Sequence, residues 1–113
     1  MTSPEAAAVS VNSHLLSEAV SIIAGVTWFA TKLTERSFIT RQVKNDIVSN
    51  LGFSDTDKCS RLLSAVETQV ATNPAQFHAL VDILRSEAAL MSYADVITKS
   101  YGRYRYQKLL FEV

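Results

Sequence analysis

The stretch KCSRLLSAVETQVATNPAQFHALVDIL, residues 58–84, decides the fold class. Its first part carries an apolar stripe at helical spacing: Leu62, Leu63, Val66 and Val70. The segment NPAQ then opens a new helix, with an asparagine cap, a proline in the first helical position and a glutamine that reaches back to the cap. A second stripe follows: Phe77, Leu80, Val81 and Leu84. Spacings of three and four residues on both sides of one break predict two packed helices.

Four more helices are predicted on either side, within 4–24 and over 28–37, 41–51 and 89–101. Ser3 and Pro4 suit the first helical start, Thr27 and Thr40 suit caps, and Ser54 suits the start of the helix through 62–70. Gly25 and Gly52 suit positions just after a helix, with Phe53 packing back on the turn before it. The sequence therefore predicts an all-α chain of six helices.

The remaining helices each present an apolar side. In the first it is formed by Leu15, Ala19, Ile22, Ile23 and Val26. In the second it is formed by Trp28, Phe29 and Leu33, and in the third by Val43, Ile47 and Leu51. In the last it is formed by Leu90, Tyr93, Ala94, Ile97 and Tyr101. These residues are the predicted core.

The composition limits the function classes. The chain has 113 residues, of which 48% are hydrophobic, and its formal net charge is zero. One domain with a real core is expected, and a neutral domain lacks the basic excess of most nucleic-acid binders. Cys59 is the single cysteine, which favours a reducing compartment. MTSPEAAAV lacks the basic start of a secretory signal, and the apolar run 19–30 is too short to span a bilayer. We expect a cytoplasmic protein.

Three segments carry a resemblance to a known family. WFATKLTERSFITRQVKNDI (28–47) is similar to the second and third helices of the caspase-recruitment-domain (CARD) branch of the death-fold superfamily, with Phe38, Ile39 and Thr40 opening the third. Residues 58–84 resemble its fourth and fifth helices, where Phe77 matches an anchoring aromatic, and LMSYADVI (90–97) fits its sixth. The resemblance covers roughly 13–101, after an N-terminal segment 1–12 and before an extension 102–113. The pyrin and death-effector branches share the six-helix antiparallel bundle.

The resemblance implies a non-enzymatic module that binds itself and other death-fold proteins, often in helical filaments, in apoptotic or innate-immune signalling. It implies no cofactor, small-molecule substrate or membrane. In the family, oppositely charged surfaces meet on neighbouring copies. Here a basic patch would comprise Lys32, Arg36, Arg41 and Lys44. An acidic patch would comprise Glu18, Asp55, Asp57 and Glu67. The alternative for both is an ordinary solvated face, and a structural polymer without a signalling partner fits equally.

A different function class is a helix-turn-helix that binds nucleic acid. FITRQVKNDIVSN (38–50) would then hold the recognition helix, with polar side chains able to contact phosphates and base edges: Thr40, Arg41, Gln42, Lys44 and Asn45. The usual turn glycine is absent, and Asp46 would lie near the groove.

The sequence contains no pattern typical of a catalytic or metal-binding site. His14, His78 and Cys59 lack metal-ligand spacing, and no glycine-rich phosphate loop or nucleophile elbow is present. Cys59 is expected to be a packing residue, and His78 a surface or boundary residue. Trp28 is either core or an exposed anchor for a partner.

The last residues, YGRYRYQKLLFEV (101–113), alternate tyrosines with arginines. Tyr101 is expected to end the core, with Gly102 as a helix break. If the extension is helical, one face could pack on the bundle or on a neighbouring subunit: Tyr106, Leu109, Leu110 and Val113. If it is extended, tyrosines and arginines fall on opposite sides, which would suit nucleic acid or anionic lipid.

Overall fold

A computed structural model describes residues 3–112 of the chain. Its helices are α1 (Pro4–Val11), α2 (Ser13–Ile23), α3 (Val26–Glu35), α4 (Arg41–Val48), α5 (Asp55–Thr72), α6 (Gln76–Arg85), the 3-10 helix η1 (Ala88–Leu90) and α7 (Met91–Glu112). The described residues form no strand, so the all-α prediction is confirmed. They form seven α-helices rather than six, because the first predicted helix is divided.

Asn12 divides the first predicted helix into α1 and α2, which are bent by 60°. Ser3 caps α1 as expected, accepting a hydrogen bond from the Ala6 backbone N–H at 3.1 Å. The Asn12 side-chain amide donates to the Ala8 carbonyl at 2.8 Å and to the Ser100 hydroxyl at 3.0 Å. The helix predicted within 4–24 is therefore two helices, and the Asn12 amide holds the chain at the bend between them.

The predicted apolar stripe of the first helix was partly wrong: Ala19 and Val26 are buried as predicted, but Leu15, Ile22 and Ile23 are exposed. Leu15 and Ile22 are 41% and 83% exposed, and the residues that α2 buries are Leu16, Ser17, Ala19 and Val20. The segment is apolar on nearly every side, so periodicity allowed more than one face. The contacts of α2 with α5 and η1 select the face that is buried.

Gly25 ends α2 as predicted. Its φ of 91° lies in the left-handed region that favours glycine, and its backbone N–H donates to the Val20 carbonyl at 2.8 Å. The chain turns so tightly that α3 begins at Val26, with Gly25 in the cap position. The expected Thr27 cap was therefore wrong.

Helix α4 is shorter and more exposed than predicted. Thr40 caps it, because its hydroxyl accepts from the Val43 backbone N–H at 3.2 Å. The helix ends at Val48, and α4 buries no residue fully. The expected stripe fails at Leu51, which is 98% exposed.

The turn after α4 is built by side chains. The Lys58 ammonium donates to the Val48 carbonyl at 2.8 Å, which satisfies a terminal carbonyl of α4. The Asn50 side chain accepts from the Gly52 backbone N–H at 2.8 Å. Gly52 is therefore a turn residue rather than the residue ending the helix. Phe53 packs under the Arg61 guanidinium, 3.9 Å from the ring centroid, instead of on α4.

Helices α5 and α6 each bury one apolar side in the core. Ser54 caps α5, accepting from the Asp57 backbone N–H at 3.1 Å. Both predicted stripes are buried, together with Cys59. The predicted Asn73 cap was wrong. Asn73 and Pro74 instead form a turn whose carbonyls accept from Gln76 and Phe77, both at 3.0 Å, and α6 begins two residues later than NPAQ predicts.

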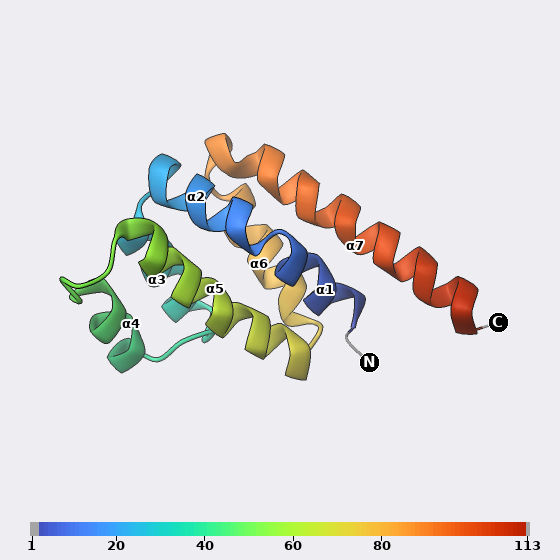
Figure 1. The fold of residues 1–113 in the computed structure, drawn as a ribbon, viewed down its shortest axis with the longest axis horizontal. Coiled ribbons are helices and arrows are strands. Elements are labelled where there is room, and N and C mark those ends of the chain that lie inside the picture. The colour runs from blue at the N-terminus through green and yellow to red at the C-terminus, as the bar shows by residue number, and fades with distance from the viewer. Residues whose placement is uncertain (1–2, 113) are drawn as a thin grey trace.

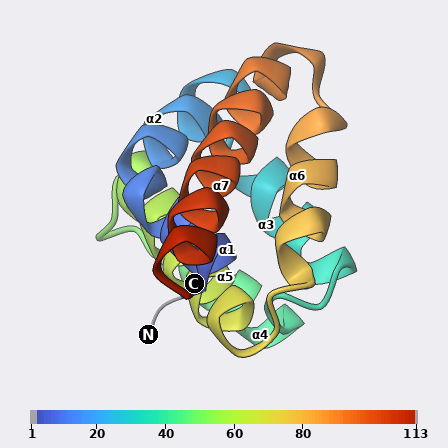
Figure 2. The same ribbon diagram turned by 90° about the vertical axis from the view of Figure 1, so that its right-hand side faces the viewer.

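Helix α7 runs without interruption across Gly102, so the predicted break there was wrong. Its first half buries Ala94 and Ile97 against the core, next to Leu90 of η1, and the Tyr101 ring packs at a tilt against Phe77 with ring centroids 5.0 Å apart. Figure 1 shows α7 along one edge of the molecule, with its last turns extending past α1. Figure 2 gives the same arrangement at right angles, and α1 contacts both α5 and α7.

Candidate protein-interaction site

The predicted basic patch lies where α3 meets α4, and we call Lys32, Arg36, Arg41 and Lys44 the basic cluster. Arg36 caps the end of α3 and Arg41 is the first residue of α4. Between them, Phe38 and Ile39 are buried and pin the connection to the core. The Phe38 backbone N–H donates to the Leu33 carbonyl at 2.9 Å, which folds the chain back at the end of α3. The connection therefore brings the cationic ends of two helices together.

Most of these cations have no acid beside them within residues 3–112. Lys32 approaches Glu35 at 3.9 Å, an exposed pair one turn apart on α3. Arg36, Arg41 and Lys44 form no ion pair with the described part of the chain, and both arginines are exposed. The basic cluster is therefore open to an external anion.

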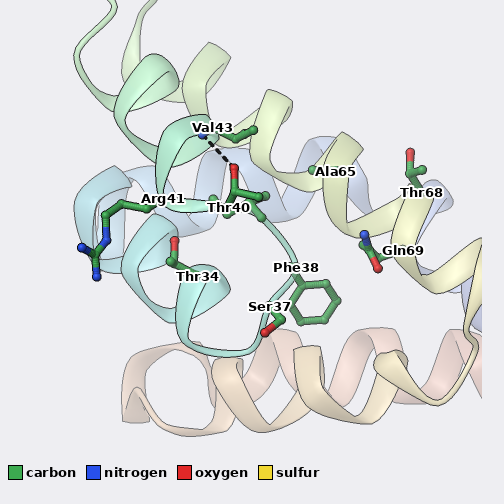
Figure 3. Close-up of a pocket in the computed structure, with 10 residues that line it drawn as sticks. Thr34, Ser37, Phe38, Thr40, Arg41, Val43, Ala65, Thr68 and Gln69 are labelled. Atoms are coloured by element: carbon green, nitrogen blue, oxygen red, sulfur yellow. Dashed lines mark hydrogen bonds between the residues drawn. The ribbon is translucent and has the colours of Figure 1, made fainter.

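A shallow groove of about 640 Å³ runs beside the basic cluster, between the α3–α4 connection and α5. Its walls are formed by Thr34, Ser37, Phe38, Ile39, Thr40, Arg41, Val43, Ala65, Thr68 and Gln69. Figure 3 shows the Arg41 guanidinium pointing away from the α5 wall, toward solvent. The groove therefore lies beside the cationic surface and contains no converging charged groups.

The structure brings together three of the four predicted acidic residues. Glu18 lies on α2, and Asp55 and Asp57 lie in the first turn of α5. α2 packs along α5, where the Ser21 and Thr56 hydroxyls are 3.4 Å apart. We call Glu18, Asp55 and Asp57 the acidic cluster. Its two aspartates are exposed and make no ion pair within residues 3–112, while Glu18 pairs with His14 at 3.1 Å.

Glu67 lies apart from the acidic cluster. It is half-buried on α5, twelve residues after Asp55, which is about 18 Å along the helix axis at 1.5 Å per residue. The sequence prediction placed Glu67 in one patch with Asp55 because both residues lie on one predicted helix. The length of that helix separates them.

Helix α4 separates the two clusters. Arg41 is at its start, and its last carbonyl is held by Lys58 from the second turn of α5, next to Asp57. Eight residues of helix span about 12 Å. The positive surface therefore covers the first half of α4 and the negative surface lies beyond its end, without an ion pair joining them among the described residues.

The extension does not pack on its own bundle through the predicted face. Tyr106, Leu109 and Leu110 are 63%, 55% and 58% exposed, although all three lie in α7. Val113, the fourth predicted residue, lies outside the described residues. Packing against the same copy was therefore the wrong alternative for these three residues.

The same extension belongs to a longer surface that sequence reasoning missed. Met91, Asp95, Lys99 and Gly102 continue the Tyr106 side of α7 toward its start, at steps of four and three residues. This spacing is visible in the sequence. The prediction of a helix break at Gly102 divided this surface into two parts, so its continuity was missed.

Cys59 is chemically protected. Its side chain is fully buried, and burial, with a smaller contribution from the Asp55 charge, raises the pKa of the thiol to about 11. The thiol is therefore protonated at neutral pH, and the thiolate is the nucleophilic form. His78 is exposed and contacts the Phe77 ring edge-on, with centroids 5.9 Å apart. No group of three His, Cys, Asp or Glu among residues 3–112 is placed to hold a metal ion.

The helix-turn-helix alternative maps onto α3 and α4. Arg41, Gln42 and Asn45 are exposed on α4, and Ser37 adopts a φ of 62°, the left-handed conformation that a turn glycine would supply. The Gln42 side-chain amide, however, donates to the Asp46 carboxylate at 3.1 Å. This carboxylate lies on the face that would approach phosphates, which disfavours that role.

Trp28 is packed rather than presented to a partner. It is half-buried against the core, and its ring lies 6.5 Å from that of Phe29 in a stacked arrangement. The interpretation of Trp28 as a boundary core residue fits this position.

Comparisons with known proteins give no family assignment. No protein-family model, no curated protein and no solved structure matches the chain. Within residues 3–112 no single helix has the length and apolar character of a membrane span. The pair α1 and α2 passes that test together but is bent by 60°.

Proposed function

We propose that the chain is a non-enzymatic interaction module of the CARD type that associates with copies of itself, the basic cluster of one copy against the acidic cluster of the next. The observation that carries the proposal is the separation of the two clusters along α4, together with five cluster residues that make no ion pair within residues 3–112: Arg36, Arg41, Lys44, Asp55 and Asp57. The resemblance of residues 28–47, 58–84 and 90–97 to the CARD branch supports the same role.

Such a contact is heterologous, because the two surfaces differ. Each copy keeps one free surface after the first contact, so addition continues and produces an open helical assembly unless the ring closes. An exposed ion pair contributes only about 0.2–1 kcal/mol. Several pairs per contact, repeated along an assembly, would hold it together and would weaken as salt screens them.

The cellular role that follows is a scaffold for apoptotic or innate-immune signalling in the cytoplasm. Assembly would bring together whatever domains or partners each copy carries. The buried, protonated Cys59 is compatible with a reducing compartment.

Charge reversal tests the proposal. Arg41→Glu places an acid in the basic cluster and is expected to abolish assembly, measured by sedimentation velocity at low and high salt and by negative-stain microscopy. Asp57→Arg should abolish it as well, and the double variant should recover part of it because the charges are exchanged. Asp82→Arg is the control, since this exposed α6 residue lies outside both clusters.

A wild-type chain that stays monomeric at high concentration and low salt would contradict the proposal. Salt-dependent retention on generic duplex DNA, lost in Arg41→Glu, would favour the helix-turn-helix alternative instead.

A further inference from the structure

The outer side of α7 forms a continuous surface over most of the 22 residues of the helix. We call it the α7 face, and it consists of Met91, Asp95, Lys99, Gly102, Tyr106, Leu109 and Leu110. Steps of three and four residues place these positions on one side of a helix. Leu90, Ala94 and Ile97 point into the core from the opposite side. The α7 face is thus the exposed side of a helix whose opposite side packs against the core.

Apolar groups lie at both ends of the α7 face. Met91 is 49% exposed near its start, and Leu109 and Leu110 are 55% and 58% exposed near its end. In the described part of the chain α7 contacts α1, α6 and η1. Exposed apolar groups that recur along one helix face mark an interaction surface.

Gly102 gives an independent indication of a close neighbour. A glycine inside a helix costs about 1 kcal/mol relative to alanine, so its presence in mid-helix calls for a packing reason. Among residues 3–112 no other segment offers one, because a Cβ added there would meet none of their atoms within 4 Å. A small residue at the centre of a helix face lets a second helix approach closely.

The charges decide the direction of that second helix. Asp95 lies in the first half of the α7 face, where its carboxylate makes an exposed ion pair with Arg85 of the same chain at 4.0 Å, and Arg103 and Arg105 lie beside its second half. A parallel second α7 would place arginines against arginines. An antiparallel one places Asp95 of each copy against the arginines of the other, which is attractive.

We propose that the α7 face binds the α7 face of a second copy in antiparallel orientation, forming a two-fold symmetric dimer. Aligning the apolar ends sets the register: Met91 packs on Leu110 of the second copy, and Asp95 lies opposite Tyr106, close to Arg103 and Arg105. Lys99 lies over Gly102, where the missing side chain leaves room. Each of these contacts occurs twice, because the dimer is two-fold symmetric.

This dimer uses neither the basic nor the acidic cluster. It is therefore separate from the proposed assembly: a dimer can form when Arg41→Glu blocks filaments, and filaments can form when the α7 face is altered. The two proposals consequently fail independently.

The first test measures dimerisation of the full chain carrying Arg41→Glu, by sedimentation equilibrium over a range of concentrations. Replacing Leu109 and Leu110 by glutamine should raise the dimer dissociation constant at least about tenfold. Asp95→Arg should raise it comparably. Combining Asp95→Arg with Arg103→Glu and Arg105→Glu should restore dimerisation, because the attraction is inverted rather than removed.

Asp82→Arg is again the matched control and should leave the constant unchanged. A chain that remains monomeric throughout would overturn the proposal. So would retention on phosphatidylserine vesicles by the monomer, lost in the glutamine variant, which would assign the α7 face to an anionic lipid surface.

The second test reads the orientation directly. Met91→Cys and Leu110→Cys in one chain are about 28 Å apart along α7, so an intramolecular disulfide is excluded by geometry. Mild oxidation should link two copies through residues 91 and 110, while Met91→Cys alone should give no linked dimer. Cys59 is buried and does not compete. Efficient linking by Met91→Cys alone would overturn the antiparallel arrangement.

Discussion

The Asn12 side-chain amide donates a hydrogen bond to the Ser100 hydroxyl at 3.0 Å, across 88 positions of the chain. The same amide donates to the Ala8 carbonyl at 2.8 Å, at the end of α1. One side chain thus fixes the bend between α1 and α2 and attaches that bend to the middle of α7.

Removing this side chain should weaken the whole domain. Asn12→Ala is expected to lower the free energy of unfolding by about 1–2 kcal/mol, since both of its hydrogen bonds are lost. Ser100→Ala should cost less, because Asn12 keeps its bond to Ala8. Urea unfolding of the two variants compares them, and equal stability of Asn12→Ala and the wild type would contradict the assigned role.

Adjacent leucines test which face of α2 is buried. Leu16 is fully buried, so Leu16→Ala should cost about 2–5 kcal/mol through lost burial and a cavity. Leu15 is 41% exposed, and Leu15→Ala should change stability by less than about 1 kcal/mol. Chemical denaturation gives both values. A larger loss of stability for Leu15→Ala than for Leu16→Ala would contradict this burial and support the stripe predicted from the sequence.

Two glycine-to-alanine changes should have opposite signs. Gly25 has a φ of 91°, so alanine there should cost about 1–2 kcal/mol through backbone strain. Gly102 lies inside α7 with open space around it, and alanine there should stabilise the monomer by up to about 1 kcal/mol. Thermal unfolding at low protein concentration, where the chain is monomeric, measures both. Stabilisation by Gly25→Ala would be inconsistent with the left-handed backbone.

Cys59 gives the domain a defined alkaline sensitivity. Its pKa is raised from 9.0 to about 11 in the folded protein, first by burial and then by Asp55. The folded state therefore favours the protonated thiol. This stabilisation is fully present below pH 9 and is lost as the pH rises toward 11.

The loss is at most about 1.4 kcal/mol per pH unit for a single proton. Urea unfolding between pH 8 and pH 11 should therefore show a steeper decline for the wild type than for Cys59→Ala, which lacks this group. Because Cys59→Ala keeps every other ionisable group, the difference in slope measures the contribution of Cys59 alone. Identical slopes would show that the thiol is not protected.

Local sequence patterns predicted the features that depend on neighbouring residues. The caps at Ser3, Thr40 and Ser54 are formed by side chains that reach a backbone N–H three residues ahead. The apolar stripes of α5 and α6 are buried because each has one apolar side and one polar side. In both cases the deciding interaction lies within one or two helical turns.

Local patterns failed at three places. NPAQ has the composition of a helix start, yet its first residues form a turn before α6. Gly52 has the composition of a helix end, yet Lys58 reaches back to α4 and ends it earlier. The charge distribution along the sequence placed Glu67 in one patch with Asp55, although the length of α5 separates the two residues.

The sequence by itself determined an all-α chain, the buried stripes of α5 and α6, and two sets of opposite charge. These follow from periodicity and capping, which act over three or four residues. Only the tertiary structure decided that Leu16 rather than Leu15 is buried, that α4 separates the charged clusters, and that α7 continues through Gly102. Those outcomes depend on contacts between helices such as Asn12 with Ser100, whose partners are far apart in the chain and carry no local pattern.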